Sequence, residues 1–470
     1  TAEDLLHRLK QNALAPPATR QDLPERQRTM NETVAWSYRL LDAHEQRAFR
    51  RLGVLTGRFS LQAAAVALTD HAALPSGRDH ALAIVASLID KSLLVRADAS
   101  LATRPLYEMF ETVRGYATSE LRADGERNDV LEGLARYATA EATEAARELI
   151  GPAQPEWLDR VRDELEMYRT ALGWLVERGR PTEAADIAYG LMFFWLIRGY
   201  GAEGLQWYER ILAQAPVPPA AESKCLLGSA VMAYTRGEVG RARTRLTCAL
   251  ERAQAAGQAE IVVQAENLCG YVELAAGNLD AARQCFTRSA AGFRELAIPW
   301  GSGNALIGLA SVALRTGDAA EAEPLLDEAT STLRYAGPWF LNLPLYLRAI
   351  LAVRRGNPDQ AIAAVRESVT RSRALHDRFA FVYALVPLAA AAVLMGHDGW
   401  AARILGARDA VTERTGAVAV DPSVCALRQR AEEDARARLG PELWRRAYAA
   451  GRRASIDSLL DDIDRVLASA

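Results

Sequence analysis

The residue types that could do chemistry in this chain are few, and the first to test are those that bind phosphate. A phosphate-binding loop, G-x-x-x-x-G-K-[ST], needs a lysine between a glycine and a serine or threonine, because backbone amides and the ammonium group surround the phosphates. The chain contains three lysines, and only Lys91 precedes a serine, with Asp90 in front of it. The motif is absent. We therefore expect no tight nucleotide binding by this chain, no cofactor in it, and no enzyme activity.

Other catalytic patterns are equally weak. Residues 199–204 (GYGAEG) match G-x-G-x-x-G by letters, but a dinucleotide site needs that string directly after a strand. Helical patterns flank it here, so we predict a turn between two helices. The histidines and cysteines show neither H-E-x-x-H nor C-x-x-C spacing, which gives no zinc site. No Ser/His/Asp or Cys/His grouping can be assembled, so the expectation is no catalytic and no metal-ligating residue.

Aromatic side chains are the strongest positive signal. Taken singly, each is most simply a core residue. Taken together, they gather before and within a repeated region, where rigid amphipathic rings make binding surface. We expect a groove that binds a small-molecule inducer or a protein partner, and the candidate residues are Trp195, Tyr200, Trp207, Tyr234, Tyr271, Trp300, Trp339, Tyr346 and Tyr383.

The elements that must position these rings follow from a ladder of five glycines. The ladder glycines are Gly237, Gly277, Gly317, Gly356 and Gly396, at spacings of 40, 40, 39 and 40. Seven residues before each stands alanine or glycine, five after each stands alanine, and nine after each stands a larger apolar residue. A fixed period of this length indicates a solenoid. Each repeat is predicted to be a helix, a glycine turn and a second helix, and stacking of the repeats supplies the core.

The predicted fold is mainly α, in five parts. Residues 1–28 are a short helix at 2–11 followed by a linker, and a chain starting at Thr1 without methionine is expected to be a piece of something longer. Residues 29–122 contain helices predicted at 29–41, 44–55, 61–68 and 81–90, with Asp42 and Ser60 as N-caps of the second and third. Strand candidates at 93–96 and 106–110 close this region, the composition of a winged helix. Residues 123–215 are a helical connector or degenerate repeats, with helices predicted at about 128–149, 156–177, 183–197 and 202–214. Residues 216–415 are a TPR-like α-α superhelix, and residues 416–470 are capping helices.

Several strings in the winged-helix region are specific enough to suggest a family. They are DLPERQRT at 22–29, WSYRLL at 36–41, FRRL at 49–52, FSL at 59–61, DKSLL at 90–94 and MFETVRGYA at 109–117. This stretch resembles the winged helix that follows the nucleotide-binding module in STAND-class (NB-ARC-type) signalling ATPases. The nearest group is the large actinobacterial transcriptional regulators of the LuxR and antibiotic-regulatory-protein types. The resemblance is specific only in roughly 22–120.

The resemblance implies a regulatory role. In that family an ATPase core and winged helix precede a TPR-like sensor, so ATP or ADP is expected only with a missing upstream module. The array would bind an inducer or partner protein, and the winged helix would relay this to the ATPase and an effector domain. DNA would be bound only through modules outside this chain, in a cytoplasmic protein whose full-length form oligomerises on ligand binding. The alternative from another class is a TPR-like scaffold that holds a partner's peptide without switching.

Two details of the winged helix are left open by the sequence. Met109, Phe110 and Glu111 stand where related ATPases carry a Met-His-Asp-like nucleotide sensor, but phenylalanine cannot donate to a phosphate, so we expect Phe110 to be a core strand residue. Arg47, Arg50 and Arg51 share one helix and could contact DNA. The family resemblance implies the other reading, in which this domain is a hinge that packs on the ATPase core. The net charge of −3 gives no general case for nucleic acid, and no apolar run reaches membrane-spanning length.

Overall fold

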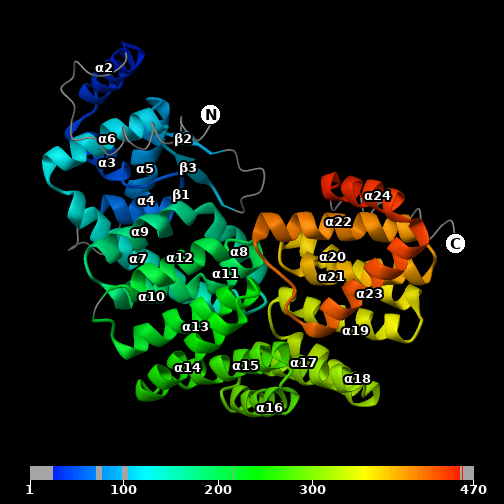
Figure 1. Cartoon of the computed structure of the whole chain (residues 1–470). Coiled ribbons are helices and arrows are strands. Elements are labelled where there is room, and N and C mark those ends of the chain that lie inside the picture. The colour runs from blue at the N-terminus through cyan, green and yellow to red at the C-terminus, as the bar shows by residue number, and fades with distance from the viewer. Residues whose placement is uncertain (1–24, 70–76, 98–103, 215, 456–457, 459–470) are drawn as a thin grey trace. The chain divides into compact units, whose positions relative to one another are not determined.

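The computed structural model describes residues 25–69, 77–97, 104–214, 216–455 and 458. The predicted helix near residues 2–11 and the linker up to residue 24 lie outside these residues. Within them the fold is mainly α, as predicted, with 23 α-helices, one 3₁₀ helix and one three-stranded sheet (Figure 1). The described chain divides into two compact units. Unit 1 runs up to Tyr137 and includes Asp163–Thr170, and unit 2 contains Ala138–Arg162 and the chain from Ala171 onward.

Unit 1 contains the predicted winged helix. Its elements are α2 (Glu25–Arg39), α3 (Ala43–Leu52), β1 (Arg58–Ser60), α4 (Leu61–Leu68), α5 (Gly77–Asp90), β2 (Val95–Arg96), β3 (Leu106–Glu108) and α6 (Glu111–Asp124). The sheet order is β1-β3-β2 with both pairings antiparallel. The order from α3 to β3 is helix, strand, two helices and a two-stranded wing, which is the winged-helix arrangement.

Local sequence explains where the first helices start. Asp42 accepts the backbone N–H of Glu45 over 2.9 Å, and the Glu45 carboxylate returns to the Asp42 N–H over 3.1 Å, a reciprocal capping box. Ser60 caps α4 through the Ala63 N–H. Both caps agree with the sequence prediction. Phe49 and Phe59 are fully buried and fix α3 and β1 in the core.

Other parts of unit 1 differ from the prediction. Strand β1 was not predicted. It has only three residues, too few to show a strand pattern, and it is recognised only by its pairing with β3, in which Phe59 lies opposite Tyr107. The helix expected at 29–41 begins at Glu25 and ends at Arg39. The strand expected at 106–110 ends at Glu108, since the chain turns there into α6.

In the next region, two of the four predicted helices are each divided into two. They are α7 (Arg127–Glu148), α8 (Gln154–Asp163), α9 (Leu165–Glu177), α10 (Pro181–Gly190), α11 (Met192–Arg198) and α12 (Gly201–Leu212). The single helix expected at 156–177 is wrong. It breaks at Glu164, whose buried carboxylate accepts the backbone N–H of Ser60 over 2.9 Å and pairs with Arg104. The helix expected at 183–197 breaks at Leu191. The GYGAEG string is the predicted turn between helices, with Gly199 at φ +77°.

Unit 2 contains the predicted array of hairpins. Its helices are α13 (Pro219–Thr235), α14 (Val239–Ala255), α15 (Ala259–Ala275), α16 (Leu279–Glu295), α17 (Pro299–Thr316), α18 (Ala319–Leu333), α19 (Asn342–Arg354), α20 (Pro358–Ala374), α21 (Ala380–Leu394) and α22 (Asp398–Thr415). The short 3₁₀ helix η1 (Pro338–Leu341) separates α18 from α19. Figure 1 shows these helices following one another as antiparallel pairs.

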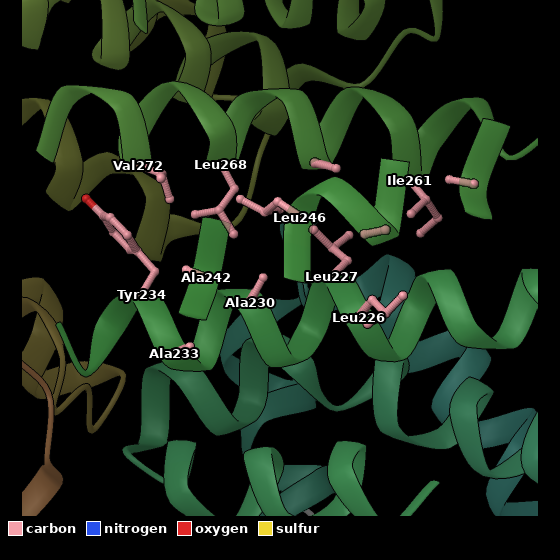
Figure 2. Packing of buried hydrophobic residues seen from close by; sticks show 13 residues of the cluster. Leu226, Leu227, Ala230, Ala233, Tyr234, Ala242, Leu246, Ile261, Leu268 and Val272 are labelled. Atoms are coloured by element: carbon pink, nitrogen blue, oxygen red, sulfur yellow. The ribbon is translucent and has the colours of Figure 1, made fainter. Parts of the chain in front are cut away.

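The ladder positions account for the packing. All five ladder glycines have φ between +69° and +84°, which favours glycine in the turn between paired helices. The residues that stand seven before, five after and nine after each ladder glycine are buried in every repeat. Figure 2 shows the first case, in which Ala230, Ala242 and Leu246 pack with Ile261 and Leu268 of the next hairpin. Each hairpin thus buries its apolar face against its neighbour.

The last two helices pack on the end of the array. Helix α23 (Pro422–Leu439) contacts α21 and α22, and α24 (Pro441–Arg453) lies along α22. The approach of α24 is close enough to require glycine: a Cβ on Gly451 would lie 1.9 Å from the carbonyl oxygen of Arg403, and one on Gly406 would lie 2.1 Å from that of Tyr448.

Candidate ligand-binding cavity

A cavity of about 160 Å³ lies inside unit 2, lined mainly by aromatic side chains. The first helix of each hairpin contributes to its wall, together with α11, η1 and the residue before α23. Six of the nine aromatic residues predicted to form a binding groove line it: Tyr234, Tyr271, Trp300, Trp339, Tyr346 and Tyr383. Three further rings complete the wall: Phe193, Phe340 and Phe379.

The lining residues share a register that the sequence contains. Trp300, Trp339 and Phe379 each stand 17 residues before their ladder glycine. Other lining residues stand 13, 10 or 6 residues before it, a set that includes Gln264, Asn304, Tyr383, Asn267, Tyr346 and Tyr271. Steps of four and three residues select one face of an α-helix. Counting back from the ladder would therefore have found Phe379 and the polar wall residues, which were missed.

The other three predicted aromatics lie elsewhere in unit 2. Trp195 is fully buried and meets Tyr208 edge-on at 5.7 Å between ring centroids. Tyr200 stacks on Phe194 at 5.5 Å. The guanidinium of Arg210 lies 4.4 Å from the centroid of the half-buried Trp207 ring. The structure does not bring these three to the cavity, because they pack instead against Tyr208, Phe194 and Arg210.

Contacts between distant parts of unit 2 close the array around the cavity. The backbone N–H of Trp339 donates to Oε1 of the buried Gln154 over 2.7 Å. The N–H of Arg378 donates to the carbonyl of Ile197 over 3.0 Å. An open concave groove was expected, and the cavity is narrower than that and only partly enclosed. Its volume is close to that of a 150 Å³ apolar cavity that holds a molecule such as benzene.

Hydrogen bonds satisfy part of the polar wall. Nδ2 of Asn267 donates to Oδ1 of Asn304 over 2.9 Å, and the hydroxyl of Tyr271 donates to the carbonyl of Asn304 over 3.0 Å. In contrast, Nε1 of Trp300 and Oδ1 of Asn342 are buried and have no partner among the described residues. Trp300 is 6% exposed and Asn342 2%. Such groups cost free energy unless something in the cavity pairs with them.

Comparison with known proteins finds similarity over part of the chain. No protein-family model matches it. Over 195 residues, 40% of this chain, it is 35% identical to proteins of Mycobacterium bovis and Mycobacterium tuberculosis that are provisionally named HTH-type transcriptional regulators. This stretch is homologous to those proteins. The chain spans about a fifth of the length of these relatives.

Two solved structures cover most of the chain at low similarity. A Rap protein complexed with competence and sporulation factor gives a TM-score of 0.47 at 12% identity, covering 93% of this chain and 99% of that one. A STAND protein with a tetratricopeptide repeat sensor from Pyrococcus horikoshii gives 0.45 at 11% identity, covering 93% and 67%. At these values neither similarity carries a conclusion about function.

The nucleotide-sensor-like string differs from its prediction. Met109 is buried, but Phe110 is 55% exposed and is not a core strand residue. It is the N-cap residue of α6, where the backbone leaves the sheet and turns its side chain out. Glu111 is exposed and pairs with Arg114 one helical turn on.

The three arginines of α3 are held by carboxylates of unit 1. Arg50 donates to Asp124 over 2.7 Å, and Arg47 and Arg51 both donate to Glu126 over 2.9 Å. The side chain of Arg51 is 4% exposed and also donates to the carbonyl of Ala67. These contacts use the guanidinium groups to join α3 to the end of α6.

Among the helices of the described residues, none combines the length and the apolar character that a membrane span needs.

Proposed function

We propose that this chain is the sensor portion of a transcriptional regulator, whose helical array binds a small-molecule inducer in the aromatic cavity. The observation that carries the proposal is the aromatic cavity, whose lining includes Trp300 and Asn342 with their unpartnered polar groups. The homology to HTH-type regulators supports the regulatory role. Transcription control by the whole protein, through an ATPase and a DNA-binding module outside this chain, is part of the proposal, as is a cytoplasmic location.

The mechanism is a differential-affinity switch. A ligand shifts a conformational equilibrium only by the difference in its affinity for the two states. Here the array would hold the inducer in one packing of its hairpins, and the winged helix of unit 1 would pass this state to the upstream ATPase. In this view the chain itself neither binds nucleotide nor catalyses a reaction.

Native mass spectrometry of the purified chain, after incubation with an actinobacterial small-molecule extract, tests the binding step. We expect one small molecule per chain, lost in Val231→Phe, which fills the cavity from α13. Val262→Phe is the matched control, because Val262 is also partly buried but does not line the cavity. Binding of no small molecule would contradict the proposal, and a stoichiometric protein partner recovered in a separate pull-down from a cell lysate would then favour the scaffold alternative.

Hydrogen exchange tests the relay separately. Once a bound molecule is found, residues 43–124 should exchange at a different rate with and without it. Unchanged exchange in these residues at saturating ligand would leave a binding array without a relay.

A further inference from the structure

One end of the cavity contains four tyrosines and a buried carboxylate. Tyr234, Tyr271, Tyr346 and Tyr383 come from four different hairpins, and Asp421 precedes α23. The Val420 N–H donates to Oη of Tyr383 over 3.4 Å and so holds the neighbouring Asp421 against this wall. Burial raises the pKa of all four tyrosines, and the negative charge of Asp421 contributes to the rise in each. The phenol groups therefore surround one negative charge.

Asp421 has little positive charge to balance it. It is 5% exposed, and no ion pair joins it to a residue in the described part of the chain. Its Oδ1 accepts the N–H of Ser423 over 2.7 Å at the start of α23. Arg315 and Arg354 favour its ionised form, but both are exposed, and Arg354 donates instead to the carbonyl of Leu314. Burial outweighs them and raises the pKa of Asp421.

Two of the phenol groups are also free to bind. The hydroxyls of Tyr234 and Tyr346 have no hydrogen-bond partner in the described residues, whereas those of Tyr271 and Tyr383 are bonded. Figure 2 shows the Tyr234 hydroxyl pointing away from the aliphatic cluster of α13 to α15. The rings of Tyr346 and Tyr383 are 5.3 Å apart and inclined at 48°, so they present faces in different directions.

We propose that this end of the cavity is a cage for the ammonium group of a small organic cation, with Asp421 as its counter-ion. The proposal rests on the proposed ligand-sensing function and names the chemical class of the ligand. A cation near aromatic faces is stabilised by the negative π-systems. Burying a charge is costly unless an opposite charge and hydrogen bonds meet it. Asp421 supplies the charge, and the two free hydroxyl oxygens can accept from the ammonium.

The rest of the cavity fits a flat apolar body. Phe193, Trp300 and Phe340 form a mutually tilted or edge-on group with centroids 5.2–5.4 Å apart. The cavity volume of about 160 Å³ is close to that of a cavity that holds a benzene ring. The ligand class is thus an arylalkylamine, an amine on an alkyl carbon that carries one aromatic ring, and a hydrogen-bond acceptor on that ring would use the free Nε1 of Trp300.

A matched series of probes tests the charge. Benzylammonium, benzyl alcohol and benzoate have similar size and differ in charge. Calorimetric titration of the purified chain at pH 7 should give at least tenfold tighter binding for benzylammonium than for benzyl alcohol, and the weakest binding for benzoate. Asp421→Asn should weaken benzylammonium about tenfold and leave benzyl alcohol within threefold. Asparagine remains a good N-cap for α23.

Asp318→Asn is the control for the substitution itself. Asp318 also caps a helix, accepting the Glu321 N–H over 2.8 Å, but it does not line the cavity. Equal binding of ammonium and alcohol, or an unchanged ammonium affinity in Asp421→Asn, would overturn the cation assignment and leave the cavity as a neutral-ligand site. Binding of none of the three probes would also overturn it, and the extract experiment would then decide the sensing function by itself.

Discussion

The backbone N–H of Val418 donates to the carbonyl oxygen of Thr235 over 2.8 Å. Thr235 ends α13, the first helix of the array, and Val418 follows α22, the last. The segment from Gly416 to Asp421 therefore lies across both ends of the array and carries Asp421 to the cavity wall.

Substitution of two ladder glycines can separate the stability contributed by the 416–421 segment from the stability contributed by the glycine turn itself. Gly237 and Gly277 have φ of +80° and +84°, so alanine at either strains the backbone by about 1 kcal/mol. A Cβ on Gly237 would also lie 2.9 Å from Cγ2 of Val418, whereas one on Gly277 meets nothing within 4 Å. We expect Gly237→Ala to cost about 1 kcal/mol more than Gly277→Ala in urea unfolding and to speed hydrogen exchange at 416–421. Equal costs and unchanged exchange would show that the segment is not held at this point.

Asp377 predicts a pH dependence of stability in unit 2. It is buried, accepting the N–H groups of Phe379 and Ala380 at Oδ1, and burial raises its pKa to about 6. Because the folded state holds the proton more tightly, this contribution to stability is full below pH 4 and is lost as the pH rises through 6. Asp377→Asn can keep both N–H contacts. It should match the parent chain near pH 4 and be more stable by about 3 kcal/mol at pH 7.5.

Urea unfolding of both chains from pH 4 to pH 8 measures the difference directly. The difference in unfolding free energy between the two chains cancels the contribution of every group that titrates alike in both. A difference in unfolding free energy that stays constant over this range would contradict the raised pKa of Asp377.

The parts of the fold that were predicted depend on local patterns. The hairpins were predictable because a glycine turn with small residues at fixed offsets recurs, and those offsets are buried in every repeat. Asp42 and Ser60 were recognised as caps because their partners lie three residues away. Six of the cavity aromatics were predicted because they gather in the repeated region; five of them lie on first helices of repeats, and Trp339 lies in η1.

The missed features depend on residues far apart in the sequence. The break at Glu164 comes from its bond to the Ser60 N–H, 104 positions away, and the closure at Trp339 from Gln154, 185 positions away. No periodicity contains such contacts. Asp421 was missed for the same reason, since it reaches the cavity only because the segment from Gly416 to Asp421 lies across both ends of the array. Phe110 was assigned to a strand because a two-residue difference in strand length lies below what patterning resolves.

In unit 1, the Glu45–Lys91 pair predicts loss of stability in acid. Hydrogen bonds from Lys91 and Ser87 lower the pKa of Glu45 to about 2, against the effect of its burial. This contribution is full above pH 4.5 and is lost as the pH falls toward 2. Glu45→Gln keeps the capping box but loses the charge, at a cost of about 2 kcal/mol near pH 7.

Hydrogen exchange of α3 at pH 7 and pH 3 measures this cost within unit 1. Protection of residues 43–52 should fall in Glu45→Gln at pH 7 and approach that of the parent at pH 3. Glu111→Gln is the control, because its pair with Arg114 is exposed and is expected to contribute under 1 kcal/mol. Equal loss of protection at both pH values would assign the effect to packing instead of charge.

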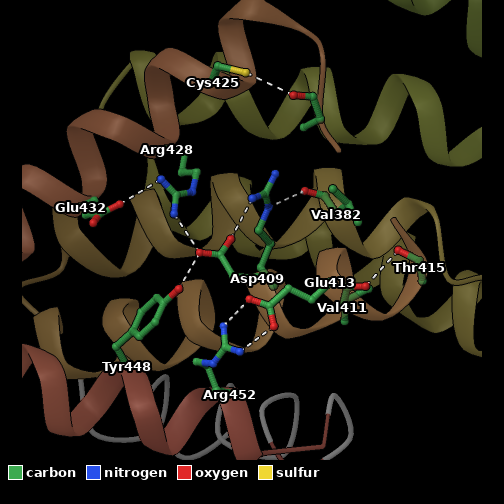
Figure 3. Close-up of polar contacts among 12 residues, drawn as sticks. Val382, Asp409, Val411, Glu413, Thr415, Cys425, Arg428, Glu432, Tyr448 and Arg452 are labelled. Atoms are coloured by element: carbon green, nitrogen blue, oxygen red, sulfur yellow. Dashed lines mark hydrogen bonds and ion pairs between the residues drawn. The ribbon is translucent and has the colours of Figure 1, made fainter. Parts of the chain in front are cut away.

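Asp409 of α22 joins α23 and α24, the closing helices, to the array, and its removal should lower the stability strongly (Figure 3). Its Oδ1 accepts Arg408 over 2.8 Å, and its Oδ2 accepts Arg428 of α23 over 2.8 Å and the hydroxyl of Tyr448 of α24 over 2.7 Å. Burial raises the pKa of Asp409, but these donors outweigh it and the pKa is lowered. Asp409→Ala leaves two guanidinium groups without this acceptor and should cost about 3 kcal/mol.

The neighbouring Glu413 supplies the comparison on the same helix. It pairs with Arg452 of α24 over 2.5 Å, but its side chain is 60% exposed, so Glu413→Ala should lower the stability much less than Asp409→Ala. Both substitutions remove one carboxylate that bridges α22 to α24. Thermal unfolding should therefore give a much lower midpoint for Asp409→Ala than for Glu413→Ala, with faster proteolysis of α23 and α24 only in the former. Similar midpoints for the two variants would mean that the glycine-mediated packing of α24, and not the Asp409 contacts, holds the closing helices in place.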